Sequence, residues 1–147
     1  MGKEDYVVIC GDFGGVWHTD RKSAAESPEE AQALDWLENR PFTTLFIPGN
    51  HENYDRLMPS VTEREYGLYN IHAFLKQHDR LDFVFTHDAP ASDKSYLGYD
   101  GTDELNRYFE SLRDEMKYGY WFYGHLHENR RVMDNHYLLY EQIVRVC

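Results

Sequence analysis

This chain of 147 residues has few cysteines, no long apolar run and a shortage of positive charge. Its two cysteines, Cys10 and Cys147, are too few for a disulfide-bonded scaffold, and Cys10 ends an apolar run, which favours a buried small hydrophobe over a catalytic thiol. No apolar stretch approaches the roughly 20 residues needed to cross a bilayer, and the first residues lack the basic start and apolar segment of a signal peptide. We therefore predict a cytoplasmic protein with no membrane partner.

Positive charge is scarce, because 15 lysines and arginines face 26 acidic residues, which gives a formal net charge of −11. An acidic surface repels the phosphate backbone of nucleic acids, so we expect no general nucleic-acid binding. A phosphate-ester substrate is still compatible with this charge, because a bound divalent cation reverses the sign of the local field. The oligomeric state is left open by these numbers.

The apolar content predicts a folded chain with one domain spanning residues 1–147, since 41% of the residues are hydrophobic and 16% are aromatic. Four short runs rich in β-branched and aromatic residues predict strands at 6–10, 43–47, 83–86 and 120–123. Their nearly continuous apolar character is typical of strands covered on both faces.

Helical patterns separate these strands. Capping sequences predict helix starts at residues 27–30 and 62–65, and a third helix is expected after Thr102. The residues expected on the buried helix faces are Ala31, Leu34, Leu37, Leu68, Ile71, Leu75, Leu105, Tyr108, Phe109, Leu112 and Met116. Strands alternating with helices predict an α/β fold with a partly parallel sheet, closed by a hairpin of residues 130–133 and 136–146. Residues 14–26 and 88–101 are expected to be irregular loops.

Ligand-type side chains follow each of the four predicted strands, where α/β proteins bind their ligands. Asp12 follows the first, Asn50, His51 and Glu52 the second, His87 the third, and His125 and His127 the fourth. Each residue alone has an ordinary explanation as a turn former, a cap or a loop histidine. Together, carboxylate, amide and imidazole groups form a mixed oxygen and nitrogen set that suits Mn, Fe, Zn or Ni. The remaining histidines His72, His78 and His136 are interpreted as structural.

These strings resemble four of the five signature motifs of the calcineurin-like metallophosphoesterase superfamily, in order and in residue type. The matching strings are Gly11-Asp12, Gly49-Asn50-His51-Glu52, His87 and Gly124-His125-Leu126-His127, and residues 85–90 resemble the small bacterial and phage members. The resemblance implies a β-sandwich flanked by helices that hydrolyses a phosphomonoester or phosphodiester with metal-activated water, manganese being the expected metal.

The resemblance also implies a role for each residue. Asp12 would bridge two metals, Asn50, His87 and His125 would complete the shell of one, and His127 would bind the other. His51 would be the catalytic residue that protonates the leaving group or stabilises the charged transition state. Glu52 has two interpretations, an orienter of a neighbouring ligand or a solvated loop carboxylate.

The sequence departs from the family pattern in two places. It contains no Asp-x-His motif before Asp12, and residues 53–82 are short for the family, so we expect the first strand and part of the central sheet to be missing. Three explanations stay open: a truncated fragment, a short enzyme with one metal, or an inactive relative that serves as a metal-binding or interaction module. His18 or Asp20 are candidates to replace the missing ligands. A zinc peptidase that uses His125 and His127 is disfavoured, because the helical His-Glu-x-x-His pattern is absent.

Overall fold

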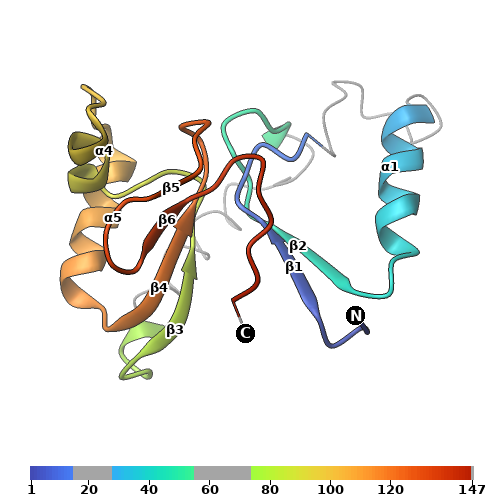
Figure 1. Ribbon diagram of the computed structural model, residues 1–147, viewed down its shortest axis with the longest axis horizontal. Helices are drawn as coiled ribbons and strands as arrows, with labels where there is room; N and C mark the ends of the chain where they lie inside the picture. The colour runs from blue at the N-terminus through green and yellow to red at the C-terminus, as the bar shows by residue number, and fades with distance from the viewer. Residues whose placement is uncertain (15–27, 55–73, 147) are drawn as a thin grey trace. The chain divides into compact units, whose positions relative to one another are not determined.

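The computed structural model describes residues 1–14, 28–54 and 74–146 (Figure 1). Contacts divide the chain into two compact units, Met1–Tyr69 and Asn70–Cys147, which are called the first and second unit below and are described separately. The single domain predicted for residues 1–147 stays a prediction. The helix expected from residue 62, together with His18, Asp20 and His72, lies outside the described residues.

The first unit contains a parallel pair of strands and one helix. Strand β1 (Tyr6–Ile9) pairs with β2 (Thr43–Phe46), with Tyr6 opposite Thr43 and Ile9 opposite Phe46. Helix α1 (Pro28–Glu38) starts where the Ser-Pro-Glu-Glu pattern predicts. Its predicted inner residues Ala31, Leu34 and Leu37 are partly buried, whereas most of the other side chains of α1 are exposed. The 3.6-residue spacing of apolar side chains therefore predicted the buried face of this helix correctly.

The second unit is built on a four-stranded mixed sheet in the order β3-β4-β6-β5. Strands β3 (Leu81–Phe85), β4 (Tyr118–Tyr123) and β6 (His136–Leu138) are parallel, and β5 (Arg130–Arg131) is antiparallel to β6. Helices α4 (Ala91–Leu97) and α5 (Glu104–Glu115) lie on one side of this sheet (Figure 1). Helices are interspersed with mainly parallel strands in the described residues, so the predicted α/β class is confirmed.

The core of the second unit lies between the sheet and its helices. Trp121, Tyr123 and Leu138 are fully buried and pack with Leu112 of α5. The opposite face of the sheet carries a ladder of aromatic rings in mutual contact: Phe83, Phe85, Tyr120, Phe122 and Tyr137. Alternation along each strand sends successive side chains to opposite faces, which explains both layers.

Three expectations for the second unit are wrong. Residues 88–101 contain α4, which has no periodic apolar stripe to reveal it because its buried residues, Asp93 and Lys94, are polar. The last strand ends at Leu138 and residues 141–146 are exposed, so the hairpin is shorter than predicted. Leu105 is exposed, because the neighbouring Asn106 takes the buried position and binds Asp88.

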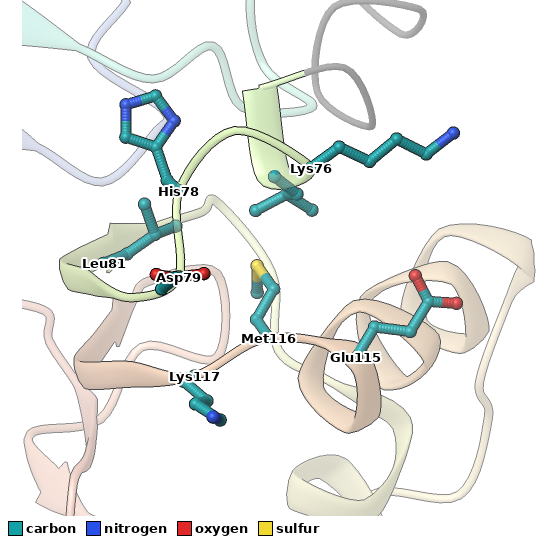
Figure 2. A pocket seen from close by; sticks show the side chains of 8 residues that line it. Lys76, His78, Asp79, Leu81, Glu115, Met116 and Lys117 are labelled. Atoms are coloured by element: carbon teal, nitrogen blue, oxygen red, sulfur yellow. The ribbon is translucent and has the colours of Figure 1, made fainter.

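A cavity of about 300 Å³ lies at the amino ends of β3 and β4 (Figure 2). Its lining includes the apolar side chains of Leu75, Leu81 and Met116 beside charged side chains such as Lys117. This edge of the sheet is opposite the edge that carries the predicted metal ligands of the second unit, so the cavity is separate from them.

Two further observations bear on the sequence predictions. Burial raises the pKa of the Cys10 thiol to about 11, so little thiolate forms at neutral pH, which agrees with a packing role. Within the described residues, no helix has the length and apolar character needed to span a membrane.

Candidate metal centre

In the first unit, Asp12 and His51 follow neighbouring parallel strands and are joined directly. Asp12 lies after β1, and the loop of Asn50 and His51 lies after β2. The backbone N–H of His51 donates to Asp12 Oδ1 over 3.0 Å, while the side chains of Asn50 and His51 are exposed. The structure therefore joins the predicted bridging carboxylate to the backbone of the predicted catalytic histidine, whose side chain is exposed.

Gly49 permits this contact between the two loops. A Cβ atom at position 49 would lie 2.1 Å from Asp12 Oδ1 and 2.4 Å from the Asp12 backbone nitrogen, which no side chain tolerates. The Tyr54 hydroxyl donates to the Gly49 carbonyl over 2.7 Å and anchors the loop from within. Glycine at this position is thus required by the close approach of Asp12.

Glu52 is buried, so its interpretation as a solvated loop carboxylate is wrong. Its Oε1 accepts a hydrogen bond from the Gly14 backbone over 3.1 Å, which ties the loop after β2 to the loop after β1. Its Oε2 is buried without a hydrogen-bond partner among the described residues. A buried carboxylate oxygen without a donor is unfavourable unless positive charge compensates it, and a nearby cation fits that need.

In the second unit, His87 and His125 present ring nitrogens to each other. The loops after β3 and β4 are joined by a hydrogen bond from the Gly124 N–H to the His87 carbonyl, 2.9 Å. His87 Nε2 lies 3.1 Å from His125 Nδ1, and the rings meet edge to face at 74°. Two nitrogens bound at 2.0–2.1 Å to a tetrahedral ion are separated by roughly 3.3 Å, so this pair fits a shared cation.

Asp88, which sequence reasoning did not assign to the site, lies behind His125. Its carboxylate accepts hydrogen bonds from Ala89, Lys94 and Asn106 and is 3.9 Å from His125 Nε2. Burial by itself raises the pKa of Asp88, but these donors and the nearby His125 outweigh burial and lower that pKa below its ordinary value. Asp88 is therefore a stable anion 3.9 Å from the outer nitrogen of His125, a distance at which the two groups interact by charge and not by a hydrogen bond.

Asn106 connects the site to helix α5. Its side chain accepts from the Asp103 N–H while Asp103 accepts from the Asn106 N–H, which forms a reciprocal cap at the start of the helix. The Asn106 amide also donates to Asp88 and to the Ala89 carbonyl. The start of α5 thus fixes the loop that carries His87.

Three of the predicted metal ligands have an unusual backbone conformation. Asp12, His125 and His127 have φ angles of 49°, 69° and 54°, and they are the only non-glycine residues with positive φ in the described part of the chain. Such conformations are unfavourable for residues with a Cβ atom and concentrate at functional sites. All three were predicted as metal ligands from sequence. His127 is exposed, and its ring stacks on Tyr140.

Within each unit, then, side chains with oxygen or nitrogen donors follow the parallel strands at their carboxyl ends, as in an α/β protein with candidate metal ligands at that edge of the sheet. A sequence model of the calcineurin-like phosphoesterase family matches residues 2–129, and the chain belongs to this family. Comparison with curated proteins and with solved structures gave no match. The family indicates a hydrolase that acts on phosphate esters with divalent metal ions.

Proposed function

We propose that this chain hydrolyses a phosphomonoester or phosphodiester with divalent cations bound by Asp12, Asn50, His87, His125 and His127. The observation that carries the proposal is the 3.1 Å separation of the His87 and His125 ring nitrogens, which suits a cation. Family membership supports it, because the matched residues 2–129 include all five ligands. Mixed nitrogen and oxygen ligands favour manganese, with iron, zinc or nickel as alternatives.

Each residue of the proposed site has a separate role in hydrolysis. When bound, divalent cations supply a nucleophile from water near neutral pH and neutralise charge on the phosphoryl oxygens. The His51 N–H holds the Asp12 carboxylate, and the Asp88 anion lies 3.9 Å from His125 Nε2. The His51 side chain is exposed, and by analogy with the family its imidazole would protonate the leaving-group oxygen.

The cellular setting belongs to the same proposal. The low cysteine content supports a cytoplasmic location, where thiols stay reduced. The net charge of −11 supports a small or protein-borne phosphate ester over nucleic acid in general.

Hydrolysis of a chromogenic aryl phosphate with added Mn²⁺ tests the proposal. His51→Ala is expected to lower kcat by roughly 10²–10⁴-fold while Mn²⁺ binding persists, because it removes only a proton donor. Asp12→Asn is expected to weaken Mn²⁺ binding and to abolish turnover. His78→Ala is the matched control, since His78 is an exposed histidine outside the ligand strings.

Activity that survives both His51→Ala and Asp12→Asn would rule out this mechanism. Mn²⁺ binding with no turnover of monoesters or diesters would instead identify a metal-binding or interaction module.

A further inference from the structure

Tyr140 lies beyond the residues matched to the phosphoesterase family, which end at 129, yet its ring covers a predicted metal ligand. The Tyr140 and His127 rings are stacked, with centroids 4.8 Å apart and an angle of 19° between their planes. Aromatic stacking of this kind stabilises a pair of rings by more than the burial of their apolar area alone. The family match assigns no role to Tyr140.

The backbone around Tyr140 is fixed on this loop by two hydrogen bonds. The Leu139 N–H donates to the Tyr123 carbonyl over 2.8 Å, which keeps the chain beside the carboxyl end of β4 after β6 has ended. The Tyr140 N–H then donates to Asn129 Oδ1 over 2.8 Å, two residues beyond His127. The stack is therefore built by the path of the chain and does not depend on the tyrosine side chain alone.

The ring of His127 is restricted by few features of its own position. It is exposed and has a left-handed φ of 54°, so neither burial nor a favoured backbone conformation restricts its ring. The turn before it is held by Tyr99, whose hydroxyl lies 3.2 Å from the Leu126 carbonyl and 3.1 Å from Glu128 Oε1. These contacts fix the turn's backbone and the next side chain, and among the described residues the stack on Tyr140 is the contact that fixes the imidazole plane.

We propose that Tyr140 is a positioning residue for His127, whose imidazole it holds in one orientation ready to bind a cation. The inference rests on the proposed function, in which His127 is a metal ligand. A ligand ordered before binding loses less rotational freedom when the cation arrives, so its affinity is higher. The stack supplies this order from a residue outside the family motifs.

Mn²⁺ titration of the whole chain, compared with Tyr140→Ala and Tyr140→Phe, tests the inference. Tyr140→Ala is expected to weaken Mn²⁺ binding by roughly twofold to tenfold, the range that corresponds to one aromatic stack. Tyr140→Phe keeps the ring and is expected to bind like the parent chain. Tyr96→Ala, which removes another exposed tyrosine, is the matched control.

Turnover at saturating Mn²⁺ separates weaker metal binding from general damage to the fold. Saturating Mn²⁺ is expected to restore the kcat of Tyr140→Ala to that of the parent chain, because only metal affinity has changed. Equal Mn²⁺ affinity of Tyr140→Ala and the parent chain would overturn the positioning role. A raised KM of Tyr140→Ala with unchanged Mn²⁺ affinity would also overturn it, because Tyr140 would then contact the substrate. An equal loss of Mn²⁺ affinity in Tyr140→Phe would overturn it as well, because that variant keeps the ring.

Failure of the proposed function gives a different result. A parent chain that binds no Mn²⁺ overturns the proposed function and the role of Tyr140 together. A parent chain that binds Mn²⁺, with no difference among the position-140 variants, overturns the role of Tyr140 alone.

Discussion

At the residue scale, three of the five candidate ligands have backbone conformations that residues with a side chain rarely adopt. The positive φ angles of Asp12, His125 and His127 raise the energy of the three turns that present them. Local contacts hold each turn, such as the His51 N–H on Asp12 and the Tyr140 ring on His127. The turns that carry these side chains are therefore held in place without a bound ion, which is the arrangement expected of a binding site.

Gly49→Ala tests the close approach between the loops of the first unit. The new Cβ would lie 2.1 Å from Asp12 Oδ1, so the two loops must separate. We expect the free energy of unfolding to fall by about 1–3 kcal/mol, as for other overpacked sites, and Mn²⁺ affinity to fall with it. Urea denaturation and Mn²⁺ titration measure the two effects.

Gly2→Ala is the control for this change, because a Cβ at position 2 meets nothing within 4 Å. Equal behaviour of the two alanine variants would show that the Gly49 loop does not need its close contact with Asp12.

At the element scale, a buried polar cluster joins α4, β4 and β6. Asp93 Oδ2 accepts from the Tyr123 hydroxyl over 2.8 Å and from His136 Nδ1 over 2.5 Å. A carboxylate only accepts, so Nδ1 carries the hydrogen in this contact, and with a neutral ring the Tyr118 hydroxyl donates to His136 Nε2 over 2.7 Å. His136 was correctly placed at the start of a strand, but its partners could not be inferred from sequence.

Asp93→Ala is expected to lower the free energy of unfolding by about 1–3 kcal/mol for each buried donor that loses its acceptor. The substitution leaves the buried hydroxyl of Tyr123 and the ring of His136 without their acceptor. Asp134→Ala is the control, because Asp134 is fully exposed and its ion pair with Arg131 is long, 3.7 Å. Urea denaturation compares the two variants.

If Asp93→Ala does not fold, Asp93→Asn retains the shape and one acceptor oxygen and is expected to show a smaller loss. An unfolding midpoint that moves no more for position 93 than for position 134 would contradict the importance of this cluster.

At the scale of the whole molecule, partly buried tyrosines make the stability of the fold sensitive to alkaline pH. Burial raises the pKa of Tyr108, with a further contribution from Glu115. Burial also raises the pKa of Tyr118, where Arg113 opposes the shift and nearby carboxylates add to it. The unfolded chain releases these protons near the ordinary tyrosine pKa of 10.0, whereas the folded chain retains them to higher pH.

The higher tyrosine pKa of the folded chain determines how its stability changes with pH. Below the ordinary pKa both states keep the protons and stability is unaffected, and above it the unfolded state is favoured because only that state ionises. We therefore expect the urea midpoint to fall as the pH rises past about 10. Tyr118→Phe is expected to flatten this dependence, whereas Tyr96→Phe, at an exposed position, is not. Midpoints that stay level into the alkaline range would contradict the prediction.

Much of the fold was predictable because the signals are local. The four main strands lie within two residues of their predicted bounds, since β-branched and aromatic runs define them directly. Helix α1 followed from its capping pattern and its apolar spacing. Helix α4 was missed because its buried face is polar, and that face is stabilised by hydrogen bonds to distant residues that no short window contains.

The sequence by itself determined which chemical groups stand at the strand ends and therefore the class of ligand they suit, because turn residues and strand patterns act over a few positions. The tertiary structure decided how those groups are held. The His87–His125 contact, the burial of Glu52 and the donors around Asp88 join residues separated by up to 38 positions. Contacts at such separations depend on how strands pair and pack, and that information is spread over the whole chain.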